Sequence, residues 1–208
     1  LSVFSFHPVK HVTTGEGGMV VSDNPDLIAR VKQFRNHGIT TDLHEREAAG
    51  SWYYEIADIG YNYRLTDFQC ALGIAQLEKL AASIEKRNAI ARCYDEFFSQ
   101  VPQVSALHTQ PYNHHAYHLY VIQLHLETVS RTRQQIFSFL RSENIGVNVH
   151  YIPVHCHPFY QKKFHTFKGL CPSAEAAYER ILTLPIFPSM DKTDMDRVCQ
   201  AVQIAVQN

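Results

Sequence analysis

The sequence lacks a long apolar run, a surplus of charge and any paired cysteines, and each absence excludes a class of protein. Lysine and arginine number 19 against 20 aspartates and glutamates, so the basic surface of a nucleic-acid-binding protein is not expected. No window holds the uncharged apolar stretch of a membrane helix, and LSVFSF lacks the length and basic flank of a signal peptide. We therefore expect neither nucleic acid nor a membrane as a partner.

The five cysteines are scattered, and no C-x-x-C pair occurs among them. An odd number at such spacing is typical of reduced, mostly buried thiols, so we expect a cytoplasmic protein. Apolar residues make up 45% of the 208 residues, enough for a core in one large domain or two small ones.

The start of the chain has the pattern of two strands joined by a glycine turn. LSVFSF predicts a buried strand, residues 19–23 predict a second strand, and T-T-G-E-G-G between them allows a tight reversal. Asn24 and Pro25 are typical of a helix start, and Gly38 is typical of a helix end.

A long segment without periodicity follows, from residue 39 to residue 63, and we interpret it as a functional loop. Thr66 and Gln69 then have the spacing of a capping box. They open a helical pattern that runs to about Phe98, with an interruption expected near residues 80–82. We expect this helix to connect two lobes.

The second half has the pattern of a small α+β lobe. We expect, in order, a strand at 115–126, a helix capped by Thr132, a strand from residue 147 until Pro153, a helix from Ser173 to about Leu182 and a final helix at 194–206.

The position of Lys10 in the sequence suggests that it is a catalytic residue. It follows an apolar strand and precedes a glycine turn, so it lies at a strand end, where α/β folds build their sites. A lysine held there can lose its proton and form a Schiff base with a carbonyl, and pyridoxal phosphate is the usual partner. Ser5 offers a hydroxyl for the phosphate. From the pattern alone, a solvated surface lysine remains the commoner alternative.

Two groups of histidines suggest a metal site: His150, His155 and His157, and His114, His115 and His118. Imidazoles at such spacing can bind zinc. No carboxylate or cysteine stands at a recognised ligand spacing with them, so we expect no metal, and polar contacts near a substrate pocket or exposure on a strand are the alternatives.

Residues 4–18, FSFHPVKHVTTGEGG, resemble the cofactor-lysine segment of the DegT-type sugar aminotransferases, which are fold type I pyridoxal phosphate enzymes. The likeness continues through NHGI, IGYNYRLTDFQCALGIAQLEKL, VNVHYIPVHCHPFY and LTLPIFPSM, over essentially the whole chain. HPVK, GYNYRLTD and VHYIPVH are most similar to the altrosamine transaminases of pseudaminic acid synthesis. The resemblance implies an α/β fold, with the end of the large domain at 1–80 and a linking helix plus a small α+β domain at 81–208.

The resemblance also implies roles for individual residues. Lys10 is then the catalytic Schiff-base lysine, Ser5 binds the cofactor phosphate and His7 lines the pocket. Asn62, with Arg64 close by, reaches the phosphate in the site of a neighbouring subunit, so a homodimer with shared active sites is expected.

His150, Tyr151 and His155 match a segment that lies near the sugar substrate in the family. The implied reaction is amino transfer from an amino acid, with glutamate the expected donor. The implied acceptor is a 4-keto-6-deoxy nucleotide sugar used in bacterial surface-glycan synthesis. Lys10 would move the proton in both halves of this reaction.

In the family, the carboxylate that protonates the pyridine nitrogen comes before the lysine strand, whereas only nine residues precede Lys10 here. We therefore expect this chain to be the C-terminal part of a longer enzyme and to be inactive alone. The alternative is a non-catalytic relative that acts as a binding or dimer-partner module.

Overall fold

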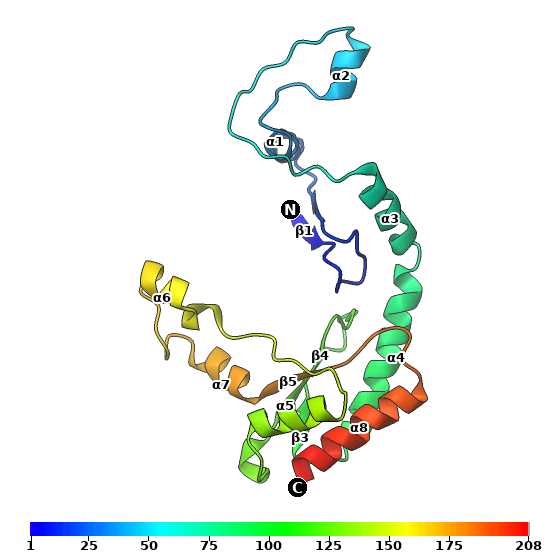
Figure 1. Cartoon of the computed structure of the whole chain (residues 1–208), viewed down its shortest axis with the longest axis vertical. Coiled ribbons are helices and arrows are strands. Elements are labelled where there is room, and N and C mark those ends of the chain that lie inside the picture. Colours follow the sequence, from blue (N-terminus) through cyan, green and yellow to red (C-terminus); the bar gives the residue numbers. More distant parts are fainter. Residues whose placement is uncertain (208) are drawn as a thin grey trace. The chain divides into compact units, whose positions relative to one another are not determined.

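The computed structural model describes residues 1–207 and divides them into two compact units, 1–81 and 82 onward (Figure 1). The two units are described one at a time. Among residues 1–207, no helix combines the length and the apolar content needed to cross a membrane.

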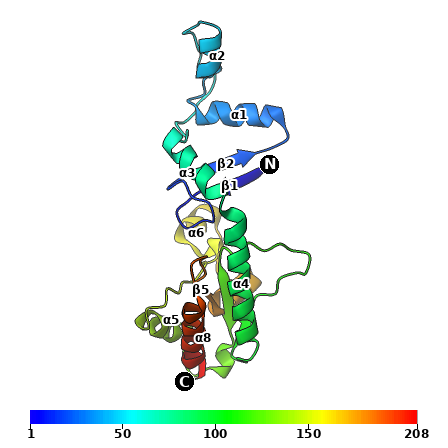
Figure 2. The ribbon, with the colours of Figure 1, turned by 90° about the vertical axis from the view of Figure 1, so that its right-hand side faces the viewer.

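The first unit begins with a two-stranded antiparallel ribbon, which Figure 2 shows side by side. Its elements are β1 (Ser2–Ser5), β2 (Gly18–Val21), α1 (Pro25–Arg35), α2 (Leu43–Ala48) and α3 (Asp67–Leu77). The two predicted strands and the first predicted helix are confirmed. The Asn24 side chain accepts a hydrogen bond from the Leu27 N–H at 3.1 Å and so caps α1 as expected.

The expectation that the first strand is buried is wrong for this chain. Val3 is 72% exposed and Phe4 is 51% exposed. The reason is that β1 and β2 form a two-stranded ribbon, which leaves these apolar side chains largely exposed.

The segment 39–63 is a loop, as expected, except for the six-residue helix α2. A capping box of Asp42 and Glu45 starts this helix. Because α2 buries no side chain, it has no apolar stripe from which the sequence pattern could have predicted it.

The capping box of Thr66 and Gln69 is confirmed at the start of α3. The expected interruption is also present, but it lies at residues 78–79, slightly earlier than predicted. The next helix, α4 (Leu80–Phe98), buries a face that includes Ile90, Tyr94 and Phe98.

The second unit is built around a three-stranded antiparallel sheet in the order β3-β4-β5 (Figure 1). Its strands are β3 (Val104–Ala106), β4 (Tyr120–Leu124) and β5 (Ile181–Leu184). Its helices are α5 (Arg133–Ser142), α6 (Pro158–Phe164), α7 (Pro172–Arg180) and α8 (Lys192–Gln207), with short 3-10 turns η1 (Leu126–Thr128) and η2 (Val154–Cys156). The core joins α4, the sheet, α5 and α8 through fully buried side chains such as Tyr94, Ile122, Leu140, Leu182 and Val202.

The strand predicted from residue 147 until Pro153 is wrong. Only Asn148 forms a bridge there, exchanging two backbone hydrogen bonds with Thr183 of β5. Pro153 has no N–H to donate to a ladder, and the chain then turns into η2. This short bridge is nevertheless important, because it places the residues that follow it beside β5.

The helix predicted from Ser173 to Leu182 is also partly wrong. Its N-cap residue is Cys171 rather than Ser173, and it ends at Arg180. Residues 181–184 instead form β5, in register with β4 from Tyr120↔Leu184 to Gln123↔Ile181. Burial against β4 therefore overrides the local helical pattern. The capping box of Thr132 and Gln135 and the final helix are confirmed.

Candidate active site

Lys10 lies on a tight turn that leaves the end of β1. The Lys10 N–H donates to the His7 carbonyl at 2.9 Å, and the His7 N–H donates to Ser5 Oγ at 3.4 Å. The chain then folds back, since the Thr14 N–H donates to the Phe6 carbonyl at 3.1 Å. Ser5, His7 and Lys10 are thereby gathered at one strand end, with Lys10 partly buried.

The T-T-G-E-G-G segment holds this turn in shape. Thr14 is buried, and its hydroxyl donates to the Glu16 carbonyl at 2.7 Å. Gly17 has a φ of +151°, and a Cβ there would lie 2.5 Å from Thr14 Oγ1 and 2.8 Å from a methyl carbon of Leu65. The first turn of α3 adds a further hydrogen bond, from Gln69 Nε2 to the Glu16 carbonyl at 3.0 Å. The glycines are therefore needed both for conformation and for close approach.

The donor set of this turn fits pyridoxal phosphate. Lys10 supplies the primary amine that a carbonyl requires, and the Ser5 hydroxyl supplies a donor for a phosphate oxygen. His7 Nε2 lies 3.9 Å from Glu16 Oε1, with both side chains largely exposed. The turn thus combines an amine, a hydroxyl and an imidazole within six residues of sequence.

Asn62 and Arg64 belong to a second cluster, at the end of α1. Asn62 forms an antiparallel bridge with Asn36, and Arg64 Nη1 donates to Asn36 Oδ1. Both residues have exposed side chains. They are therefore held by their backbone and by Asn36 while remaining accessible to a ligand or to another chain.

Two glycines, Gly38 and Gly60, make this second cluster possible. The sequence pattern identified only Gly38, as the residue that ends a helix. A Cβ on Gly60 would lie 2.1 Å from the Gly38 nitrogen, and a Cβ on Gly38 would lie 1.8 Å from the Asp58 carbonyl oxygen. Two backbone segments therefore touch here without side chains between them. The signals in the sequence are NHG and IGYN, which contain these glycines.

His150 and Tyr151 lie in the second unit, directly after the bridge to β5. His150 Nδ1 lies 2.9 Å from the hydroxyl oxygen of the buried Thr183. The Tyr151 ring packs edge-on against the His150 ring, with centroids 4.6 Å apart, and is 67% exposed. The structure therefore fixes His150 and leaves Tyr151 open to a ligand.

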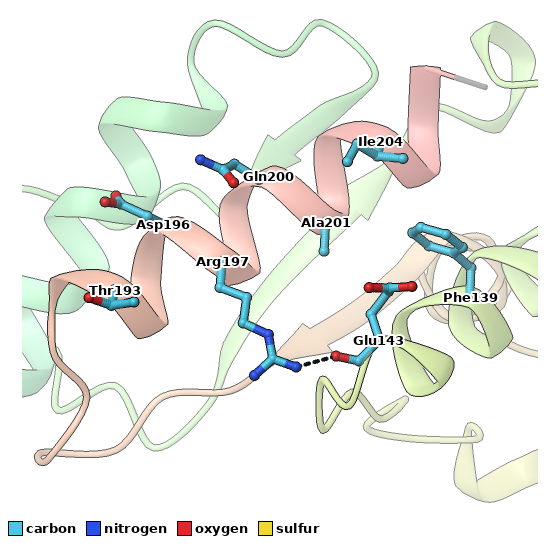
Figure 3. Close-up of a pocket in the computed structure, with 8 residues that line it drawn as sticks. All are labelled: Phe139, Glu143, Thr193, Asp196, Arg197, Gln200, Ala201 and Ile204. Atoms are coloured by element: carbon cyan, nitrogen blue, oxygen red, sulfur yellow. Dashed lines mark hydrogen bonds between the residues drawn. The ribbon is translucent and has the colours of Figure 1, made fainter.

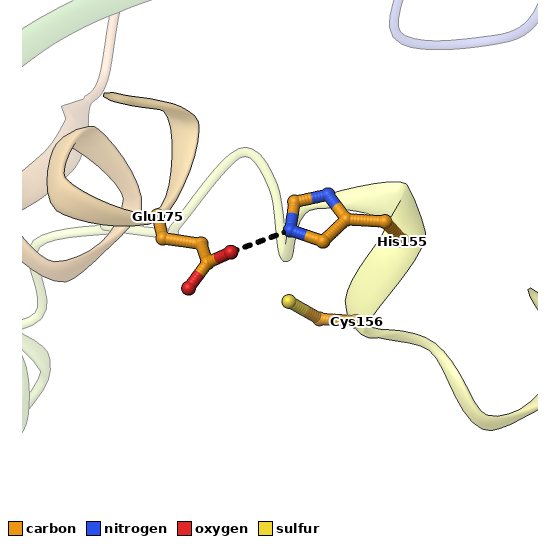
Figure 4. Close-up of side chains that lie close together, drawn as sticks. All are labelled: His155, Cys156 and Glu175. Carbon is orange, nitrogen blue, oxygen red and sulfur yellow. Dashed lines mark hydrogen bonds and ion pairs between the residues drawn. The ribbon is translucent and has the colours of Figure 1, made fainter. Parts of the chain in front are cut away.

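His155 differs from these two residues because it is buried. Its Nε2 atom lies 2.8 Å from Glu175 Oε1 of α7 (Figure 4). The hydrogen bond with His155 lowers the pKa of Glu175, and a second hydrogen bond from the Gly169 N–H, at 2.6 Å, acts in the same direction. Nothing in the sequence pattern pointed to Glu175, which lies 20 positions after His155.

A groove of about 390 Å³ lies between α5 and α8 (Figure 3). Arg197 donates across it to the Glu143 carbonyl. It is lined by Phe139, Glu143, Thr193, Asp196, Arg197, Gln200, Ala201 and Ile204. None of the predicted site residues is among them, so this groove has no part in the site described above.

Comparison with known proteins identifies a family and shows how much of each relative this chain covers. Residues 1–203 match the sequence pattern described as the DegT/DnrJ/EryC1/StrS aminotransferase family. The spore coat polysaccharide biosynthesis protein SpsC of Bacillus subtilis is 38% identical over 208 residues, covering 99% of this chain and 54% of SpsC. The UDP-4-amino-4,6-dideoxy-N-acetyl-beta-L-altrosamine transaminase of Campylobacter jejuni is 41% identical over 194 residues, covering 93% of this chain and 49% of that protein.

Among solved structures, Helicobacter pylori PseC, an aminotransferase involved in the biosynthesis of pseudoaminic acid, superposes with a TM-score of 0.88 at 32% identity. The match covers 99% of this chain and 53% of PseC. The chain thus spans about half the length of the relatives that it matches.

Proposed function

The chain belongs to the DegT/DnrJ/EryC1/StrS aminotransferase family, and from this premise we propose that it carries the cofactor lysine of an enzyme that aminates a nucleotide-linked keto sugar. Its fold is that of the fold type I pyridoxal phosphate transferases. The observation that carries the proposal is the turn after β1, where Ser5, His7 and Lys10 are gathered at one strand end. The relatives with roles in polysaccharide and altrosamine synthesis support a sugar as the substrate.

Lys10, Ser5 and His7 are proposed to hold pyridoxal phosphate. Lys10 would supply the amine for the cofactor aldehyde, Ser5 would supply a hydroxyl donor for its phosphate and His7 would line the pocket. When bound, the cofactor supplies an electron sink for the carbanion formed at the reacting carbon. Lys10 then moves protons as a general acid and base, taking one from the α-carbon of the amino donor and delivering one to C4 of the sugar. Glutamate is the proposed donor.

The second cluster is proposed to serve the site of a neighbouring subunit. Asn62 and Arg64 are exposed at the end of α1, so their amide and guanidinium groups are available to a phosphate on a partner chain. This proposal requires a homodimer with shared active sites.

His150 and Tyr151 are proposed to contact the sugar. Thr183 orients the His150 ring, and the exposed Tyr151 ring offers an apolar face and a hydroxyl. His155 was predicted to contact the substrate as well. Because the Nε2 atom of His155 is hydrogen-bonded to Glu175, we propose instead that His155 holds the segment of His150 and Tyr151 in place without contacting the sugar.

Labelling of the cofactor lysine tests the proposed function. The chain is incubated with pyridoxal phosphate, reduced with borohydride and mapped by peptide mass spectrometry. We expect one dominant adduct at Lys10, lost in Lys10→Ala and retained in Lys79→Ala, a change at an exposed lysine. Labelling spread evenly over the exposed lysines would contradict the enzyme assignment and favour a non-catalytic binding or dimer-partner module.

Turnover is a separate question, because the chain spans about half the length of its relatives. We propose that the 208 residues alone do not turn over a UDP-linked 4-keto-6-deoxy sugar, and that the complete activity belongs to a longer enzyme. Release of the aminated sugar by a homogeneous sample of this chain, measured by mass spectrometry, would refute that part of the proposal.

A further inference from the structure

Three side chains with metal-binding atoms meet in the second unit, and the family resemblance gives no role to two of them, Cys156 and Glu175. His155 and Cys156 come from η2, and Glu175 comes from α7 (Figure 4). The ring nitrogen, the sulfur and a carboxylate oxygen all lie within 4.8 Å of one another. The side chains of His155 and Glu175 are only 10% and 12% exposed, so the group is shielded from bulk water.

We propose that His155, Cys156 and Glu175 bind one zinc ion. Thiolate and imidazole ligands favour zinc over magnesium or calcium, which take oxygen ligands. Three protein ligands leave a fourth tetrahedral position for water. The sequence pattern argued against a metal because no cysteine or carboxylate had a recognised spacing, and the fold removes that objection by bringing in Glu175.

The His155 nitrogen and the Glu175 oxygen lie close to the spacing that two ligands of a tetrahedral zinc require. Zinc bonds to nitrogen and oxygen are about 2.0–2.2 Å long, so two such ligands lie roughly 3.3 Å apart around the ion. His155 Nε2 and Glu175 Oε1 are 2.8 Å apart, the distance at which they share a proton. Replacing that proton by zinc requires the two groups to part by about 0.5 Å.

Hydrogen bonds already hold the Glu175 carboxylate and the backbone of His155 in place. The Gly169 N–H donates to Glu175 Oε1 at 2.6 Å, and the Thr166 hydroxyl donates to the His155 carbonyl at 2.8 Å. Such outer partners typically fix the orientation of metal ligands. Gly169 has a φ of +102°, which brings its N–H to the carboxylate in a conformation that other residues rarely adopt.

The charges also balance within the group. A thiolate and a carboxylate neutralise Zn²⁺, and a neutral imidazole completes the set, so no net charge is buried. The ion would join η2 to α7 and thereby restrain the segment that starts at the Asn148 bridge and carries His150 and Tyr151. This inference does not depend on pyridoxal phosphate or on Lys10.

Zinc binding by the whole chain tests the inference. The metal-free chain is dialysed against Zn²⁺ in excess Mg²⁺, and bound zinc is counted by mass spectrometry. Cobalt substitution then reports the ligands, because a cobalt–thiolate bond gives a near-ultraviolet charge-transfer band and a tetrahedral site gives intense visible bands. We expect one zinc per chain and both spectral features.

Matched variants identify the ligands. Cys156→Ser and Glu175→Gln should each weaken zinc binding by at least about tenfold, whereas Cys171→Ser, at an exposed cysteine, should leave it unchanged. Far-ultraviolet circular dichroism confirms that each variant is folded. Lys10→Ala should keep full zinc binding, so the zinc result can be judged independently of whether the proposed function is correct. Failure to retain zinc, a missing thiolate band, or equal binding by Cys156→Ser would each overturn the inference.

Discussion

Replacing Gly60 by alanine should detach the segment that carries Asn62 and Arg64 from α1. The added Cβ would lie 2.1 Å from the Gly38 nitrogen and 2.9 Å from the Phe34 carbonyl oxygen. Both are backbone atoms, so no side-chain rotation can relieve the clash. The segment must move away from the helix end.

The cost follows from the hydrogen bonds that join the two segments. The His37 N–H donates to the Tyr61 carbonyl at 2.9 Å, the Tyr61 N–H to the Phe34 carbonyl at 2.7 Å and the Tyr63 N–H to the Arg35 carbonyl at 2.9 Å. At a net value of about 1 kcal/mol each, their loss amounts to roughly 3 kcal/mol. The open population of this segment should therefore rise by about 100-fold.

Amide hydrogen exchange measures this opening directly. In Gly60→Ala, protection should fall at the amides of His37, Tyr61 and Tyr63, while the core of the second unit keeps its protection. Gly146→Ala is the matched control, because a Cβ at Gly146 has nothing within 4 Å. Unchanged protection in Gly60→Ala, or an equal loss in the control, would refute the argument that backbone contact between the two glycines holds this cluster.

Four further predictions concern the second unit. Leu182→Ala, at a fully buried position of β5, should lower the free energy of unfolding by about 2–5 kcal/mol in urea titrations, and a smaller loss would show that the cavity collapses. Thr132→Ala removes the cap of α5 and should cost about 1 kcal/mol in the same assay, whereas no change would mean that water replaces the cap. Burial raises the pKa of the Cys199 thiol to about 12, so iodoacetamide at pH 8.5 should label the exposed Cys70 and not Cys199. Equal labelling of the two cysteines in the folded chain would disprove this prediction. The pKa of Cys199 in the folded chain lies above its ordinary value of 9.0, so the stability that the protonated thiol confers is complete below pH 9 and is lost as the pH rises toward 12. In urea titrations between pH 9 and pH 12, the free energy of unfolding should therefore fall less for Cys199→Ala than for the unchanged chain.

Local signals predicted the helix starts well. Asn24 caps α1, and the boxes built on Thr66 and Thr132 open α3 and α5 as expected. Each of these signals depends on atoms no more than three residues apart, so the surrounding fold hardly alters it. Asn144, which follows the end of α5, has a φ of +57°, as a helix-ending residue often does.

Strands were harder to predict because their partners are distant in sequence. Residues 181–184 continue a helical pattern but pair with β4, about 60 positions earlier along the chain. Residues 147–152 have the pattern of a strand, yet only Asn148 forms a bridge with β5. In both cases, the available pairing edge determined the structure more than local preference did.

The family prediction from the motifs is confirmed by the match over residues 1–203, and the fold type I assignment is confirmed with it. The division at residue 80 into a large-domain end and a small domain remains a prediction, as do the roles of the individual site residues. The substrate, the donor and the dimer remain proposals.

The sequence alone determined the turn of Ser5, His7 and Lys10, because these residues lie within six positions and the glycines beside them dictate the reversal. Only the tertiary structure brought Glu175 to His155 and Cys156, since that contact depends on α7 lying against η2. The same holds for Gly60, whose lack of a side chain matters only because the end of α1 touches it. Short-range geometry is encoded residue by residue, whereas contacts between distant segments exist only once the core has placed those segments.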